Sequence, residues 1–251
     1  MRISWYVREH QSLASEALSP VAVEFTGSST DALDFEYLPR VVNLQSRSYS
    51  VWVYRNADEG GTILGSYSDD SGFNIYAGWQ VAIASKLFTV FGNWLTVDNV
   101  LTPAVWHHIV VTFDASIGSS ADPIVYVDGS PVAITEPSSP SGTLKNEDGI
   151  HLMIGNINTI TQNYNGAWGG KIKNARIYNR ILSAAEVTTL YNAGVPDETL
   201  VTSGLVFQGL MVQTSRLAEY VDHDLTDGMN IIDNVYWAVG SPHGTPTGRN
   251  P

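Results

Sequence analysis

Two adjacent histidines, His107 and His108, are the first residues of this sequence whose type suggests chemistry. Imidazole nitrogens are common metal ligands, so the pair looks like part of a metal site. It lies in the stretch WHHIVVTFD, which reads as a strand, and consecutive strand residues point to opposite faces. We therefore expect both to be structural. No ligand spacing links the remaining histidines, His10, His151, His223 and His243.

Acidic turns are the second candidate, because hard cations such as Ca²⁺ bind clustered oxygen atoms. Two stretches, SDDSGFN and KNEDG, carry oxygen-bearing side chains: Asp69, Asp70, Asn74, Asn146, Glu147 and Asp148. Their spacing matches no known calcium loop. The sequence therefore predicts no metal site and no cofactor, with calcium as the one cofactor left as a candidate. The alternative interpretation is a pair of solvated acidic turns.

Aromatic side chains suggest a third kind of chemistry, the binding of sugars. The chain has seven tryptophans, and Trp79 and Trp94 stand beside turns, where an exposed indole face can serve as a sugar platform. Tryptophans in β-sandwiches more often belong to the core, with their N–H group bonded locally. Trp79 and Trp94 are the two candidate ligand-binding residues.

Short strands have to position these residues. Segments such as SYSVWVY, GFNIYAG, VAIAS and WHHIVVTFD are rich in β-branched and aromatic residues, and Gly, Asp, Ser or Asn interrupts them at short intervals. That rhythm is typical of an antiparallel sandwich. Asp128-Gly129 marks a hairpin turn. Ile172 is out of phase with Ala175 and Ile177, which predicts a bulge near Asn174.

One helix interrupts the strands, in RIYNRILSAAEVTTLYNAG. Ser183 and Glu186 have capping-box spacing, and Leu182 and Val187 have the spacing of a hydrophobic staple. Val187, Leu190 and Tyr191 form a narrow apolar stripe, and Gly194 and Pro196 would end the helix. A helix this short is not stable alone, so its stripe must pack on a larger body.

The C-terminal segment shows another pattern. Met229, Ile232, Val235, Tyr236 and Val239 fall on one face of a helix, and a Pro/Gly-rich arm follows. We predict an N-terminal strand or arm over 1–20, a jelly-roll domain over 21–212, and a helical C-terminal extension with an extended arm over 213–251. The stripe would contact either the chain's own sandwich or a neighbouring chain.

Composition limits the partners. The chain of 251 residues carries a formal charge of −12, which disfavours nucleic acid, and it has no cysteine, which excludes disulfides and thiolate chemistry. No apolar run is long enough to cross a membrane, and the first residues do not read as a secretion signal.

The order of motifs resembles a known family. WHHIVVTFD, VYVDG, IGN and KIKNARIYNRILSAAEVTTLYNAG follow one another as in the concanavalin A-like, laminin-G-like jelly-roll domains, and the resemblance covers about residues 21–195. It implies an all-β antiparallel jelly-roll sandwich in which a short helix follows the penultimate strand. The family often has acidic residues where this chain has Lys173 and Asn174.

Some enzymes on this fold cleave polysaccharides with carboxylates two residues apart on one strand. The stretch DALDFEY comes nearest to this pattern, because Asp34 and Glu36 are two residues apart. Asp31 does not have that spacing, so the third carboxylate of the pattern is missing. No G-x-S-x-G motif or phosphate-binding glycine loop followed by lysine is present. We therefore predict a protein that is not an enzyme.

Two functions fit the sequence. The first is a structural or adhesive subunit on the outside of a larger assembly, a virus or phage particle above all, with neighbouring protein subunits as partners and a homo-oligomeric state. The second is a carbohydrate-binding module of a secreted or cell-surface protein, with calcium as its candidate cofactor. A surface glycan is the partner in the second case.

Overall fold

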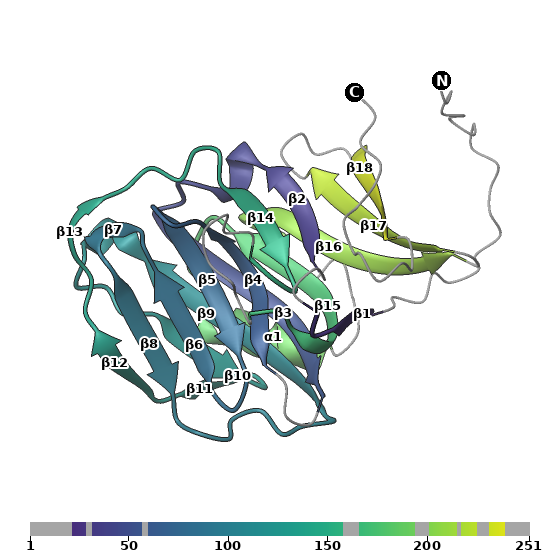
Figure 1. Cartoon of the computed structure of the whole chain (residues 1–251), viewed down its shortest axis with the longest axis horizontal. Helices are drawn as coiled ribbons and strands as arrows, with labels where there is room; N and C mark the ends of the chain where they lie inside the picture. The colour runs from purple at the N-terminus through teal and green to yellow at the C-terminus, as the bar shows by residue number, and fades with distance from the viewer. Residues whose placement is uncertain are drawn as a thin grey trace.

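The computed structural model of the chain describes residues 22–28, 32–56, 60–157, 166–193, 201–214, 217–224 and 231–238. These residues form two facing antiparallel sheets with one short helix outside them (Figure 1). The predicted all-β sandwich is confirmed. Among the described residues, no helix is long and apolar enough to cross a membrane.

The larger sheet has nine strands in the order β11-β10-β9-β3-β15-β16-β17-β18, and β1 pairs with the first half of β15 on the same edge as β16. Its strands are β1 (Val23–Thr26), β3 (Ser46–Arg55), β9 (Trp106–Asp114), β10 (Ile124–Val127), β11 (Ser130–Val132), β15 (Gly169–Tyr178), β16 (Leu205–Thr214), β17 (Leu217–Asp224) and β18 (Ile231–Ala238).

The second sheet has seven strands in the order β12-β8-β6-β5-β4-β14-β2 and lies in front in Figure 1. Its strands are β2 (Leu33–Tyr37), β4 (Gly61–Tyr67), β5 (Gly72–Ala77), β6 (Val81–Ser85), β8 (Gly92–Thr96), β12 (Ile134–Ser138) and β14 (His151–Ile154). A small sheet pairs β7 (Phe88–Val90) with β13 (Ser141–Leu144), and two 3₁₀ turns are η1 (Pro39–Val41) and η2 (Ala115–Ile117).

Aromatic rings join the two sheets across the core. The ring of Tyr49 on β3 stacks on Phe73 of β5 with centroids 5.3 Å apart. Phe73 also lies 5.3 Å from Phe113 of β9, which in turn lies 5.7 Å from Trp94 of β8. Strand alternation turns each of these side chains inward, so burial of their large apolar area holds the sheets face to face.

The predicted helix is α1 (Ala184–Asn192), and its capping box is confirmed. Ser183 Oγ accepts from the Glu186 amide at 3.3 Å, and the Glu186 carboxylate accepts from the Ser183 amide at 2.8 Å. Hydrogen bonds from the Arg180 guanidinium lower the pKa of Glu186 to about 2. Gly194 and Pro196, the predicted stop signal, lie outside the described residues.

The helix packs on the outer face of the nine-stranded sheet. Leu182, Val187 and Leu190 are buried against Val110 and Tyr178 of the sheet. The staple pair Leu182 and Val187 is thus confirmed as part of this second core. A helix of nine residues gains its stability from that contact.

The predicted bulge on β15 is also confirmed. The register with β3 shifts between Lys173 and Arg176, and Asn174 has φ 53°. Asparagine tolerates this left-handed conformation better than most residues. The shift keeps both Ile172 and Ala175 in the core.

The C-terminal prediction is wrong. Residues 217–224 and 231–238, expected to be helical, are the strands β17 and β18, which extend the nine-stranded sheet beyond β16 (Figure 1). The helical stripe included Ile232, Val235 and Tyr236, which lie in β18, and Met229 and Val239, which lie outside the described residues. β-Branched and aromatic residues are frequent in this segment and favour a strand. The free edge of β16 supplies hydrogen bonds to β17, and β17 in turn supplies them to β18.

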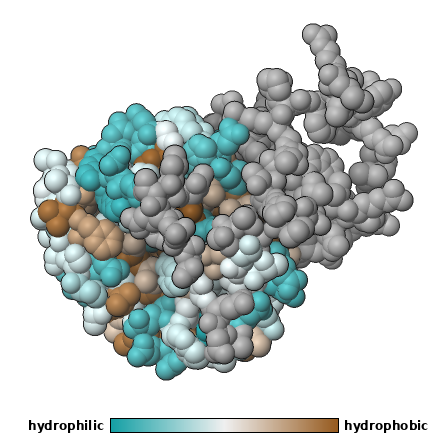
Figure 2. Space-filling model, viewed as in Figure 1, coloured by the Kyte–Doolittle hydropathy of each residue, from teal (hydrophilic) through white to brown (hydrophobic). Residues whose placement is uncertain are grey.

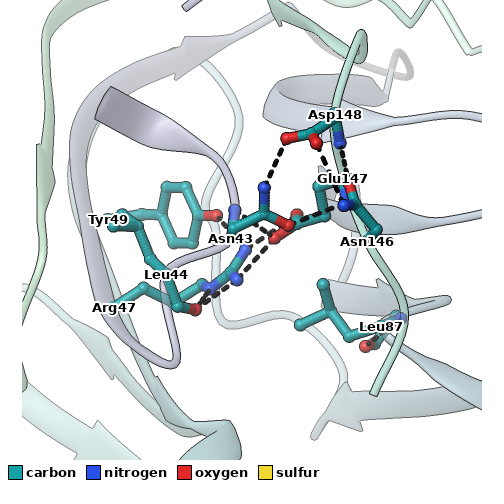
Figure 3. A network of polar contacts seen from close by, with 9 residues as sticks. Asn43, Leu44, Arg47, Tyr49, Leu87, Asn146, Glu147 and Asp148 are labelled. Carbon is teal, nitrogen blue, oxygen red and sulfur yellow. Dashed lines mark hydrogen bonds and ion pairs between the residues drawn. The ribbon is translucent and has the colours of Figure 1, made fainter. Parts of the chain in front are cut away.

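A buried ion pair ties β3 to the loop before β14 (Figure 3). The Arg47 guanidinium donates to both oxygens of Glu147, at 3.0 and 2.7 Å, and both side chains are 1% exposed. Arg47 also donates to the Leu44 carbonyl, and the backbone amide of Asn43 donates to the Glu147 carboxylate at 2.8 Å. Burial acts to lower the pKa of Arg47, but the neighbouring Tyr49 and Glu147 outweigh burial and raise it.

Candidate functional site

An open depression of about 330 Å³ lies on the outer face of the seven-stranded sheet. Its floor is a cross-strand row in which Tyr76 of β5, Ala82 of β6 and Leu95 of β8 are register partners. The row dips in the middle because alanine is smaller than its two neighbours. Figure 2 faces this sheet and shows apolar side chains breaking the polar surface over the half that contains β6, β8 and β12.

Two glycines bring backbone into this depression. A Cβ atom at Gly60 would lie 2.7 Å from the Ala77 carbonyl oxygen, closer than such atoms ever approach, so only glycine fits there. At Gly78 an added Cβ would meet the Tyr76 ring at an ordinary 3.7 Å. Gly78 thus leaves the side of the Tyr76 ring open, and Tyr76 is 37% exposed.

Trp79 forms the rim, in the turn between β5 and β6. Its side chain is 51% exposed, while the Arg55 guanidinium lies 4.5 Å from the ring centroid. The Asn99 amide donates to the Trp79 carbonyl at 2.8 Å, and the neighbouring Gln80 side chain donates to the Thr96 carbonyl at 2.9 Å. The indole is thus held in place from one side and open on the rest, as the prediction for Trp79 requires.

Trp94 does not belong to this site, and the prediction for it is wrong. The residue is fully buried, and its indole N–H donates to the Asp122 carboxylate at 2.8 Å. On β8 the residues Gly92, Trp94 and Thr96 alternate inward, so Asn93 and Leu95 are the ones that face out. Its place beside a turn was not sufficient to expose it.

The paired carboxylates of DALDFEY are already engaged. Both oxygens of Asp34 contact His151 Nδ1, at 2.9 and 3.0 Å, and Asp34 also accepts from the Glu36 amide at 2.7 Å. Glu36 has φ 56°, which interrupts the regular alternation of β2. Asp31 lies outside the described residues. Asp34 and Glu36 are therefore not a free pair for acid–base work.

The residues proposed for calcium make contacts within the protein. Lys86 and Lys145 donate to the backbone carbonyl groups of Asp69 and Asp70, at 2.9 and 2.7 Å. Glu147 belongs to the ion pair with Arg47, and Asn74 is buried with its amide on Thr62 Oγ1.

Asp148 accepts hydrogen bonds from Asn146, Tyr37 and Asn43, which lower its pKa. In the part of the chain that the structure describes, no three His, Cys, Asp or Glu side chains gather as metal ligands would. Calcium dependence stays a prediction.

The two histidines of β9 point in opposite directions, as expected. His107 Nδ1 lies 2.7 Å from the Asp128 carboxylate, and its other ring nitrogen accepts from the Thr102 amide at 2.9 Å. His108 Nε2 lies 2.9 Å from Ser50 Oγ. This Ser–His pair is not a nucleophile, because both residues are at most 1% exposed and His108 Nδ1 has no partner among the described residues.

His108 makes the stability of the fold depend on pH. Burial, with help from the positive charge of Arg176, lowers the pKa of His108 to about 3, whereas an unfolded histidine titrates near about 6.5. The stability that neutral His108 contributes to the fold is fully present above about pH 6.5. It is lost as the pH falls toward 3, because in this range only the unfolded chain binds the proton.

We expect the free energy of unfolding to fall by about 1.4 kcal/mol per pH unit between about pH 6 and 4.5, above the range of most carboxylates. His108→Gln should flatten that slope in urea titrations at several pH values. An equal slope in both proteins would contradict the assignment.

The fold and the exposed aromatic depression define a lectin-like β-sandwich. The chain belongs to the concanavalin A-like lectin/glucanases superfamily, whose family model matches residues 27–188. No curated protein sequence matches the chain significantly.

Solved structures agree on the fold. A protein from Bacteroides ovatus for which carbohydrate binding is proposed superposes with a TM-score of 0.55 at 16% identity, over 80% of this chain and 55% of that protein. The chain thus spans little more than half of that relative's length. A heptameric SAP-like pentraxin from Limulus polyphemus superposes with a TM-score of 0.50 at 12% identity, over 91% of this chain and 99% of the pentraxin.

Sequence reasoning found Trp79 but missed the rest of the depression. The alternation of GFNIYAG and VAIAS does put Tyr76 and Ala82 on the outer phase of their strands. The missing information was the register, which places them directly opposite each other.

Proposed function

We propose that this domain binds a neutral carbohydrate in the depression formed by Tyr76, Ala82, Leu95 and Trp79. The observation that carries the proposal is the half-exposed indole of Trp79, held over Arg55 at the rim of an open, mostly apolar hollow. Sugar rings have apolar C–H faces that pack on aromatic rings, and their hydroxyl groups bond to polar rims.

The lining favours a neutral ligand over a charged one. Its members are Gly60, Tyr76, Gly78, Trp79, Gln80, Ala82 and Leu95, and none of them is charged. The Bacteroides ovatus protein, for which carbohydrate binding is proposed, supports this proposal, which concerns binding without catalysis. The other hypothesis, an adhesive subunit of a virus or phage particle, has no observation here that favours it.

A substitution that fills the hollow tests the proposal without removing an aromatic ring. Ala82→Leu should weaken binding to a neutral oligosaccharide at least about fivefold, because an added side chain takes the space between Tyr76 and Leu95. Glycan arrays of the unchanged protein would supply the oligosaccharide, and calorimetry would measure the affinity.

The matched control is Ala84→Leu. It makes the same change on the same strand but in the next outward row, beside Asn74 and Asn93 and outside the depression. Equal losses in the two variants, or no loss in Ala82→Leu, would argue against this site.

A further inference from the structure

A second exposed arrangement lies on the other sheet, where β9, β3 and β15 run side by side. Aromatic side chains project outward from β9 and β3, namely Trp106, Trp52 and Tyr54, and two lysines project from β15. The register pairs Lys173 with Trp52, Lys171 with Tyr54, and Tyr54 with Trp106. All five side chains are partly exposed.

The lysine ammonium groups lie over the aromatic rings. Lys173 Nζ is 4.3 Å from the Trp106 ring centroid and 5.5 Å from that of Trp52. Lys171 Nζ is 5.7 Å from the centroid of Tyr54. These cation–π contacts hold the ammonium groups at fixed places on the surface without neutralising them.

No oxygen partner accompanies these two cations. Among the described residues, neither Lys171 nor Lys173 has a carboxylate or carbonyl group within bonding distance. Two lysines in loops elsewhere differ, because Lys86 and Lys145 each donate to a carbonyl oxygen. Burial lowers the pKa of Lys173, which is the effect expected when a cation loses water and gains no counter-ion. An anion bound beside Lys173 would replace the favourable interaction with water that burial removes from its ammonium group.

We propose that Lys173 and Lys171 bind a short carboxylate-bearing oligosaccharide on the outer face of the nine-stranded sheet. Residues two apart on a strand are about 7 Å from each other, a spacing that suits two uronate groups of one oligosaccharide chain. The indole and phenol edges beside the lysines supply apolar contacts for the sugar rings. A long polyanion is a poorer ligand, because the chain carries a net charge of −12 and Glu24 faces Lys171 across the pairing of β1 with β15.

Trigalacturonate is the probe, and the neutral galactose trimer of the same linkage is its matched ligand. Calorimetry on the full chain should show binding of trigalacturonate that added salt weakens, whereas any binding of the neutral trimer should depend neither on salt nor on the β15 lysines. Lys173→Met keeps most of the length of the side chain and removes the charge, and should weaken trigalacturonate binding about tenfold.

Two control variants sharpen the result. Lys145→Met removes a lysine from the loop after β13 and should leave the affinity unchanged, whereas Glu24→Gln removes the opposing carboxylate and should tighten binding. If Lys173→Met does not fold, Lys171→Met takes its place.

The proposal is overturned if trigalacturonate does not bind, if the β15 lysine variant binds it with the unchanged protein's affinity, or if that variant loses affinity for the neutral trimer to the same extent. Binding of inorganic sulfate as tightly as trigalacturonate would also overturn it, since it would show a simple anion site without saccharide recognition.

Discussion

Arg47→Met is expected to lower the free energy of unfolding by about 3–5 kcal/mol, because it leaves the Glu147 carboxylate buried without its cation. Both side chains are 1% exposed, so water cannot replace the lost guanidinium. The donor to Glu147 that remains is the backbone amide of Asn43, and one such hydrogen bond is not enough to stabilise a buried charge. Chemical denaturation followed by tryptophan fluorescence measures the loss.

Two further variants make this test specific. Arg180→Met removes the exposed ion pair with Glu186, whose side chains are 29% and 32% exposed, and should cost no more than about 1 kcal/mol. Arg47→Met combined with Glu147→Leu should recover much of the loss, because the buried charge is then gone. A single Arg47→Met variant as stable as Arg180→Met would show that the buried pair does not hold β3 to the β14 loop.

Trp79→Ala should weaken binding of a neutral oligosaccharide by about thirtyfold, the equivalent of about 2 kcal/mol for removing a central aromatic contact. Trp79 is 51% exposed and its carbonyl, not its ring, bonds to Asn99, so the fold should tolerate the change. Calorimetry with the strongest neutral ligand from a glycan array measures the effect.

Phe91→Ala is the control for that variant. Phe91 is an exposed aromatic residue, 37% accessible, that does not line the depression. Its removal should leave the affinity unchanged. If Phe91→Ala weakens binding as much as Trp79→Ala, the ligand contacts apolar surface without preference for the depression.

The sequence predicts local structure well where one signal dominates. Ser183 and Glu186 lie three residues apart and find each other within one turn, and Ile172 and Ala175 reveal the bulge on β15 by their phase alone. These contacts depend on short stretches of chain, so spacing is enough to infer them.

Long-range features could not be inferred. Arg47 and Glu147 are 100 positions apart, and nothing in KNEDG distinguishes a buried ion-pair partner from a calcium ligand. Trp79 and Trp94 both stand beside turns, but only register and sheet packing turn Trp94 inward. In β18, Ile232, Val235 and Tyr236 also fit helical spacing, and pairing with the edge of β17 decides for the strand.

The central claim is that the Trp79 depression is the carbohydrate-binding site, and indole N–H signals in nitrogen-15 NMR spectra test it most directly. Seven tryptophans give seven such signals, which single substitutions can assign. Titration with a neutral oligosaccharide should shift the Trp79 indole and the amides of residues 76–82, and should leave the buried Trp94 and Trp168 indoles in place. A ligand that binds while the Trp79 signal and those amides stay unchanged would contradict the account.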